Sequence, residues 1–226
     1  MENMLFTFNF IAMKDSFKHK GLRKKLIDSL REKGIKNEKL LEAMNRVPRH
    51  LFMDSGFINH SYTDKAFPIA AGQTISQPYT VAFQTELLAP QKHQKVLEVG
   101  TGSGYQTAVL LELGARVYTI ERIKELYLYA RDQLMPLGYR PGFYYGDGYE
   151  GLPAFAPFDR ILVTAGANDV PEKLLEQLAV GGKMVVPVGD RSGQKMLLLE
   201  KKNEKEVVTS EHGRFAFVPL LQGKTN

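Results

Sequence analysis

Residues 95–104 read Lys95-Val96-Leu97-Glu98-Val99-Gly100-Thr101-Gly102-Ser103-Gly104. The apolar run at the start, with one acid inside it, predicts a buried strand, and three glycines at alternate positions follow it at once. Glycine lacks a Cβ, so the turn can adopt positive φ angles and a ligand can lie directly against the backbone. Residues 105–111 indicate a helix, whose first N–H groups have no partner within the helix. Strand, glycine turn and helix together predict a cofactor site.

The spacing of the glycines favours one class of cofactor. The dinucleotide fingerprint is G-x-G-x-x-G or A, whereas this turn is G-x-G-x-G, with Tyr105 in the place of the last small residue. Glu98 would repel a pyrophosphate, but it suits the sulfonium and ammonium of S-adenosylmethionine. Glu121 ends the next predicted strand, 116–121, where a carboxylate can accept both ribose hydroxyls. These residues favour S-adenosylmethionine, and NAD or an incidental glycine turn stay open as alternatives.

The composition narrows the class of protein. A chain of 226 residues with 43% hydrophobic and 24% charged residues has enough length for one sizeable globular domain. The net charge is +5, but the basic residues are spread out apart from the segment 18–25, so we expect a solvated surface and no nucleic-acid partner. The chain has no cysteine, which excludes disulfides, thiolate metal sites and thiol nucleophiles. We expect no metal cofactor and a cytoplasmic location.

The N-terminal residues 1–13 are apolar, with Glu2 as their only charge. They lack a basic region and a small-residue cleavage site, and they are too short to span a bilayer. We therefore expect an N-terminal extension, residues 1–18, that docks on the fold or is flexible. A single domain, residues 19–226, should follow it. We expect a monomer without a membrane partner.

Strands and helices alternate along the middle of the chain. Ser16 and Asn37 can cap two leading helices, the second stopped by Pro48, and Ser76 can cap a helix over 79–88. Strands are predicted at 95–99, 116–121, 143–148, 158–165 and 182–188, with a helix over 123–137 and one over 171–179. Antiparallel strands at 196–200, 207–208 and 215–218 follow Gly189. We expect an α/β fold with a doubly wound, mostly parallel seven-stranded sheet, an antiparallel C-terminal edge and a helical lead-in.

Polar residues fall at the predicted carboxyl ends of three strands, where open parallel sheets bind ligands. These are the glycine turn, Glu121, and Asp147 with Gly148. Asp147 could accept from the adenine amino group, although Gly-Asp-Gly also favours a plain turn. His50, beside a helix end, is more typical of a structural histidine than of a base.

Several motifs carry a resemblance to known proteins. The run from Val96 to Ala108 resembles motif I of the class I methyltransferases. The fuller set resembles the protein-L-isoaspartate (D-aspartate) O-methyltransferase family, with Thr-Ile-Ser-Gln-Pro at 74–78 as its most specific mark. The similarity covers about residues 20–223. The other marks are Arg-Val-Pro-Arg at 46–49, Gly-Asp-Gly at 146–148, the strand 158–165 and Phe-Val-Pro-Leu at 217–220.

This resemblance implies a Rossmann-like fold and a repair reaction. The family transfers a methyl group from S-adenosylmethionine to the free carboxylate of L-isoaspartyl residues in damaged proteins and peptides, and the ester then closes to a succinimide. By position, the active-site hydroxyl falls on Ser76. The implied cofactor contacts are Gly72, Gln73, Thr74, Glu98, Gly100, Thr101, Gly102, Gly104, Glu121, Arg122, Asp147 and Gly148. The implied substrate contacts are Ile75, Ser76, Val218 and Leu221.

The chemistry of the substrate explains why one hydroxyl is enough. A carboxyl with a reference pKa of about 4 is already ionised at neutral pH, so no strong base is needed. Ser76 is expected to orient this anion and not to act as a covalent nucleophile. Methylation of a small-molecule carboxylate, and a non-catalytic module that binds S-adenosylmethionine, stay open as alternatives.

Overall fold

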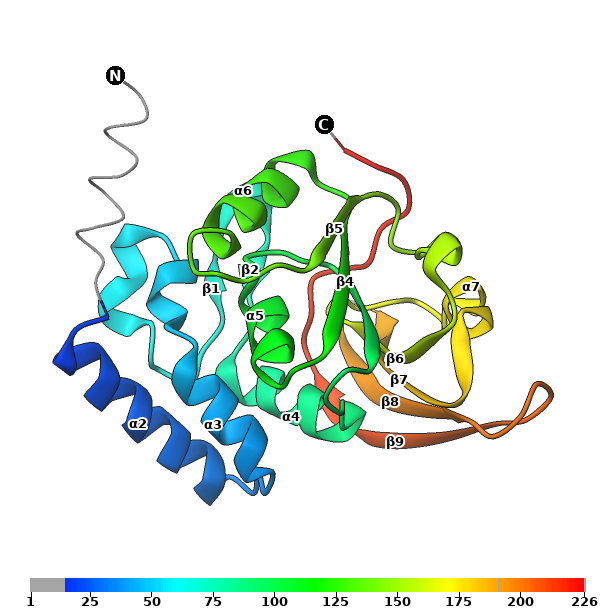
Figure 1. Cartoon of the computed structure of the whole chain (residues 1–226), viewed down its shortest axis with the longest axis horizontal. Coiled ribbons are helices and arrows are strands. Elements are labelled where there is room, and N and C mark those ends of the chain that lie inside the picture. The colour runs from blue at the N-terminus through cyan, green and yellow to red at the C-terminus, as the bar shows by residue number, and fades with distance from the viewer. Residues whose placement is uncertain (1–14, 191, 226) are drawn as a thin grey trace.

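The predicted strand before the glycine turn lies inside a seven-stranded sheet, with a neighbour on each side. We describe residues 15–190 and 192–225 of a computed structural model of the chain. In it β3 (Lys95–Val99) pairs in parallel with β4 (Arg116–Glu121) on one side and with β6 (Phe158–Val163) on the other. The order across the sheet is β5-β4-β3-β6-β7-β8-β9 (Figure 1). The glycine turn therefore leaves an interior strand of the sheet. The other strands of this sheet are β5 (Gly142–Tyr145), β7 (Leu178–Asp190), β8 (Gly193–Lys201) and β9 (Val207–Phe215).

Both faces of the sheet are covered because its strands are apolar on both sides. Val96 and Leu162 belong to one face, which packs on Leu88 of α4 (Pro78–Leu88) and Leu110 of α5 (Tyr105–Glu112). The opposite face packs on Leu174 of the short helix α7 (Glu172–Glu176). Three further helices are α2 (Phe17–Glu32), α3 (Glu38–Arg46) and α6 (Lys124–Leu134), and α2 and α3 lie together at one side of the molecule (Figure 1).

The two leading helices begin where the sequence predicts. The side chain of Ser16 accepts from the backbone N–H of His19, and the side chain of Asn37 accepts from that of Leu40. A buried guanidinium, Arg23, joins the two helices by donating to the backbone carbonyl of Asn45. Residues 15–18 of the predicted extension are thus part of this lead-in, and residues 1–14 lie outside the described part of the chain.

The predicted cap of α4 is wrong. The N-cap residue is Gln77, and no side chain caps the helix from that position. Instead Asp64, in the preceding loop, accepts from the backbone N–H of Tyr79 at 2.7 Å. The hydroxyl of Ser76 is therefore not used to start the helix. Ser76 itself follows a small hairpin made of β1 (Phe67–Pro68) and β2 (Thr74–Ile75).

Several element boundaries also differ from expectation. β5 ends at Tyr145 and not at 148, α6 ends at Leu134 and not at 137, and β8 begins at Gly193 and not at 196. The residues at 207–208 and 215 belong to one strand, β9, which pairs antiparallel with β8, and 216–218 leave the sheet. The segment after β9 runs back across the strand ends. There the Gly166 N–H donates to the Val218 carbonyl, and the Leu220 N–H donates to the Gly166 carbonyl. The helix expected over 171–179 ends at Glu176, because β7 begins at Leu178.

Candidate functional site

One cavity lies beside the glycine turn, at the carboxyl ends of β3, β4 and β6. It contains most of the residues that the sequence analysis singled out. The predicted residues that line it are Gln73, Thr74, Ile75, Ser76, Gly100, Thr101, Gly102, Glu121, Arg122, Gly148, Val218 and Leu221. Four others, Gly72, Glu98, Gly104 and Asp147, do not line it.

The turn has the backbone geometry that glycine permits. Gly100, Gly102 and Gly104 have φ angles of +96°, +53° and +86°. The hydroxyl of Thr164, after β6, lies 2.6 Å from the Gly100 carbonyl oxygen and 2.9 Å from that of Val99. A Cβ at Gly100 would stand 2.6 Å from the same hydroxyl oxygen. The Thr164 hydroxyl therefore packs against the start of the turn, and a side chain does not fit at Gly100.

Glu121 lies in the cavity wall with both of its carboxylate oxygens fixed. The Gly102 N–H donates to Oε2 and the Ile123 N–H donates to Oε1, each at 3.0 Å. Each oxygen of a carboxylate can accept more than one hydrogen bond. The position is therefore suited to a ligand with two adjacent hydroxyls.

Glu98 points into the fold and not into the cavity. Its side chain is completely buried, and the hydroxyl of Thr107 on α5 donates to it. Burial raises the pKa of this carboxyl to about 8, and the hydroxyls of Thr107 and Thr119 oppose the rise. The Thr119 hydroxyl in turn bonds that of Thr101 at 2.6 Å. Glu98 is thus a buried residue that stabilises the turn through its threonine neighbours.

Asp147 ties down the C-terminal segment. One carboxylate oxygen accepts from the Tyr149 N–H and the other from the Gly223 N–H, at 2.9 and 2.6 Å. Its neighbour Gly148 does reach the cavity. Of the other two residues outside the wall, Gly104 is the N-cap of α5, and Gly72 is exposed in a short 3-10 helix.

The Ser76 hydroxyl is available to a ligand. Within residues 15–190 and 192–225, no hydrogen bond involves it. The chain around it is fixed, because Ile75 is buried and Asp64 accepts from both the Gln77 side chain and the Tyr79 backbone.

A second hollow, which we call the aromatic groove, opens on the other side of Ser76. Thr74, Ser76, Thr164 and Val218 line both it and the cavity. Its wall carries the aromatic residues Tyr79, Phe83, Phe215 and Phe217, and its rim carries His212 and Arg214. The groove is large, at about 820 Å³. Ser76 therefore stands where the two hollows meet.

More than a third of the cavity wall was not predicted. Thr164 follows β6 directly, so the rule that ligands bind at strand ends could have found it. Gln106, in the first turn of α5, carried no such signal. The lining residues that were not predicted are Val81, Val99, Tyr105, Gln106, Ile120, Ile123, Leu126, Thr164 and Ala165. Ser103 lies in the predicted glycine turn, and Pro219 and Leu220 lie in the segment 217–220 that carries the resemblance.

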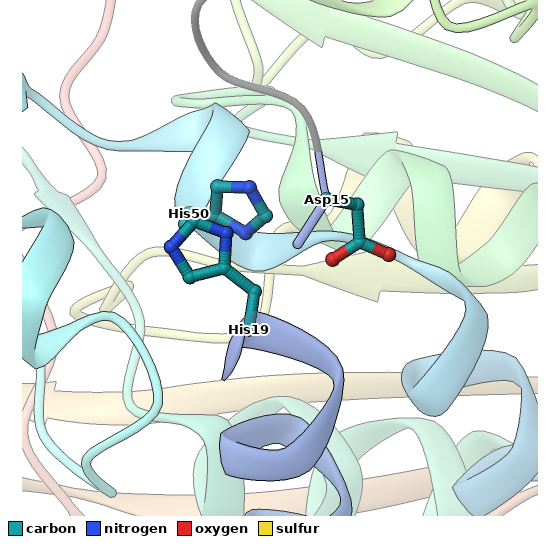
Figure 2. Close-up of side chains that lie close together, drawn as sticks. All are labelled: Asp15, His19 and His50. Carbon is teal, nitrogen blue, oxygen red and sulfur yellow. The ribbon is translucent and has the colours of Figure 1, made fainter. Parts of the chain in front are cut away.

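Away from the cavity, Asp15, His19 and His50 gather near the start of α2, with the two imidazoles side by side (Figure 2). Their ligand atoms lie within 4.8 Å of one another. Both oxygens of Asp15 accept from Arg23, and the histidine rings are tilted by 35° to each other with centroids 3.9 Å apart. Because the carboxylate is paired with a guanidinium and the two rings pack closely against each other, we interpret the cluster as a structural network that docks α2.

A family model and several known proteins that match this chain all belong to one methyltransferase family. A family model described as protein-L-isoaspartate(D-aspartate) O-methyltransferase matches residues 21–225. A protein-L-isoaspartate O-methyltransferase of Cytophaga hutchinsonii is 60% identical over 209 residues, which are 92% of this chain and 95% of the relative. One of Christiangramia forsetii is 59% identical over 94% of this chain and 100% of the relative.

Two solved structures of proteins described by the same name have a similar fold. A protein-L-isoaspartate O-methyltransferase superposes with a TM-score of 0.79 at 30% identity, over 87% of this chain and 65% of the other. A second structure is described as a protein-L-isoaspartate O-methyltransferase from Plasmodium falciparum in complex with S-adenosyl-L-homocysteine. It superposes with a TM-score of 0.74 at 25% identity, over 88% of this chain and 98% of the other.

Proposed function

The chain belongs to the protein-L-isoaspartate(D-aspartate) O-methyltransferase family, and from this we propose that Ser76 holds the free α-carboxylate of an L-isoaspartyl residue at the edge of the cofactor cavity. The protein is an S-adenosylmethionine-dependent methyltransferase that acts on isoaspartyl proteins. The observation that carries the role of Ser76 is its place in the wall of both the cavity and the aromatic groove.

The cavity fits the cofactor on two observations. The cavity wall offers bare, closely packed main chain at two glycines, since a Cβ at Gly100 would stand 2.6 Å from the Thr164 hydroxyl oxygen and one at Gly148 would stand 2.6 Å from Val99. Glu121 has both carboxylate oxygens fixed, ready to accept from ribose hydroxyls. When bound, S-adenosylmethionine supplies an electrophilic methyl group on a sulfonium. Gln73, Thr74, Thr101, Gly102 and Arg122 complete our proposed set of contacts.

Ser76 acts by hydrogen bonding. The substrate carboxylate is already an anion at neutral pH, so the site has no proton to remove. Taking this anion out of water without a donor would be costly, and the Ser76 hydroxyl supplies the donor. A bond to one oxygen leaves the second oxygen free to face the cavity. Holding two reactants in place in this way can contribute up to about 7–11 kcal/mol.

The aromatic groove favours a polypeptide over a small acid. Its lining includes Ser76, four aromatic side chains and Arg214, and its volume of about 820 Å³ is well beyond the space that one carboxylate needs. We propose that Ile75 and Val218 contact the isoaspartyl residue, that Leu221 covers it, and that flanking residues lie in the groove.

The assembly state, the location and the partners of the enzyme are also matters of proposal. We propose that the enzyme works as a monomer, that it works in the cytoplasm, and that it does not bind nucleic acid. The wide spread of its basic residues supports the last of these, and a chain without cysteine suits a reducing compartment. In the described part of the chain, no helix combines the length and apolarity that crossing a membrane requires. Light scattering on the purified protein tests the monomer.

Paired peptides test the function. Two peptides of one sequence, with either L-isoaspartate or L-aspartate at the same position, are incubated with methyl-labelled S-adenosylmethionine. We expect base-labile label on the isoaspartyl peptide alone. Equal labelling of both peptides, or label that resists base, would contradict a carboxyl methylation specific for isoaspartate. A free isoaspartyl dipeptide as a third substrate tests the groove, since it should be methylated more slowly than the longer peptide.

A further inference from the structure

The side chain of Gln106 is held in one orientation. Gln106 lies in the first turn of α5, is 8% exposed and lines the cofactor cavity. Its Nε2 donates to the hydroxyl oxygen of Thr85 at 3.0 Å, and that hydroxyl donates its hydrogen to the Val81 carbonyl at 2.7 Å. Because Thr85 has a single hydrogen and it is already used, Thr85 can only accept from Gln106. The nitrogen of the amide must therefore face Thr85.

This orientation leaves the amide oxygen without a partner. Gln106 Oε1 is buried and makes no hydrogen bond with the described residues. Buried acceptors in proteins are nearly always paired, and unpaired ones call for an explanation. An unpaired acceptor on a residue of the cavity wall points to a donor that arrives with the ligand.

The position of Gln106 in the cavity indicates which group of the cofactor can donate to it. Glu121 ends β4, and Gly148 follows β5, so the ribose and adenine ends of the cofactor belong to that side of the glycine turn. Thr85 and Val81, the partners of Gln106, are on α4, which packs against β6 and β7 on the other side, and Val81 itself lines the cavity. The sulfonium has no N–H to donate. The donor that remains on this side is the ammonium of the methionyl part.

We propose that Gln106 Oε1 accepts a hydrogen bond from the methionyl ammonium of S-adenosylmethionine. The inference rests on the proposed function, which supplies the ligand. It moves recognition of this group from Glu98, which lies inside the fold, to a residue of the cavity wall. Gln106 is then a binding residue that tells the intact cofactor from an analogue without the amino group.

Calorimetry with two ligands tests this contact. S-adenosylhomocysteine carries the ammonium, and its deaminated analogue differs only by that group. In Gln106→Leu we expect S-adenosylhomocysteine to bind on the order of tenfold more weakly than in the wild type, because a hydrogen bond to a charged group is lost. The deaminated analogue should keep its affinity within about twofold, since it never makes that bond. Its retained binding also shows that the variant folds.

A matched control separates this role from general damage to the cavity. Glu121→Gln should weaken both ligands alike, because both carry the ribose. If Gln106→Leu also weakens both alike, or weakens neither, the assignment of Gln106 is overturned while the cofactor stands. If the wild type does not bind S-adenosylhomocysteine, the cofactor assignment fails, and the role of Gln106 fails with it.

Discussion

Replacing Glu98 by glutamine should change how the stability of the protein depends on pH. Burial raises the pKa of this carboxyl from 4.5 to about 8, so the folded chain keeps it protonated while the unfolded chain ionises it above pH 4.5. The stability of the folded state is therefore fully present below pH 4.5 and falls as pH rises toward 8. Each pH unit between these two values costs about 1.4 kcal/mol. The loss approaches about 5 kcal/mol above pH 8, and about 4 kcal/mol of it falls between pH 5 and pH 9.

Glutamine has the same shape and does not titrate, so Glu98→Gln removes this dependence. We would measure the free energy of unfolding of both proteins in urea at pH 5, 7 and 9, without ligand. Groups common to both proteins cancel in the difference, which should shift in favour of the variant by about 4 kcal/mol from pH 5 to pH 9. Glu42→Gln, at an exposed position on α3, controls for the change in net charge. A Glu98→Gln difference that stays constant within about 1 kcal/mol would show that the buried carboxyl is ionised, and would refute the reasoning.

Three further changes test the cofactor turn, the ribose contact and the groove. Glu121→Ala should weaken S-adenosylmethionine binding about tenfold or more in calorimetry, because hydrogen bonds to a carboxylate are lost, and equal affinity would disprove the ribose assignment. Gly100→Ala puts a Cβ 2.6 Å from Thr164 Oγ1 at a φ of +96°, so urea unfolding should show a loss of about 1–3 kcal/mol, and unchanged stability would contradict this geometry. Arg214→Ala should raise KM for isoaspartyl peptides with an acidic neighbour and leave kcat and neutral peptides unchanged, because the rim loses its guanidinium. The same KM rise for both kinds of peptide would remove Arg214 from specificity.

The features that local sequence dictates were predicted well. The strand and glycine turn of 95–104 follow from an apolar run and from the backbone freedom of glycine, and the structure has both. The caps of α2 and α3 depend on a side chain and an N–H three residues apart, so Ser16 and Asn37 could be identified from spacing alone. Glu121 and Gly148 were placed in the cavity because parallel strands bring their carboxyl ends together.

The errors come from contacts between distant parts of the chain. Ser76 was expected to cap α4, but Asp64, which is 15 residues away from Tyr79, accepts that N–H. Glu98 was expected to face the cofactor. Its hydrogen bond to Thr107 directs it under the turn, and Val99, whose side chain points to the other face of β3, reaches the cavity. The orientation of Gln106 depends on Thr85 of another helix, which no local rule contains.

The central claim is that one serine orients a carboxylate that is already an anion. The most direct test is kcat of Ser76→Ala on an isoaspartyl peptide at saturating S-adenosylmethionine, with the dissociation constant of S-adenosylhomocysteine measured beside it. We predict that kcat falls on the order of 100-fold, because the reacting oxygen is no longer held, while the dissociation constant stays within about twofold. A variant that keeps the kcat of the wild type would contradict the account.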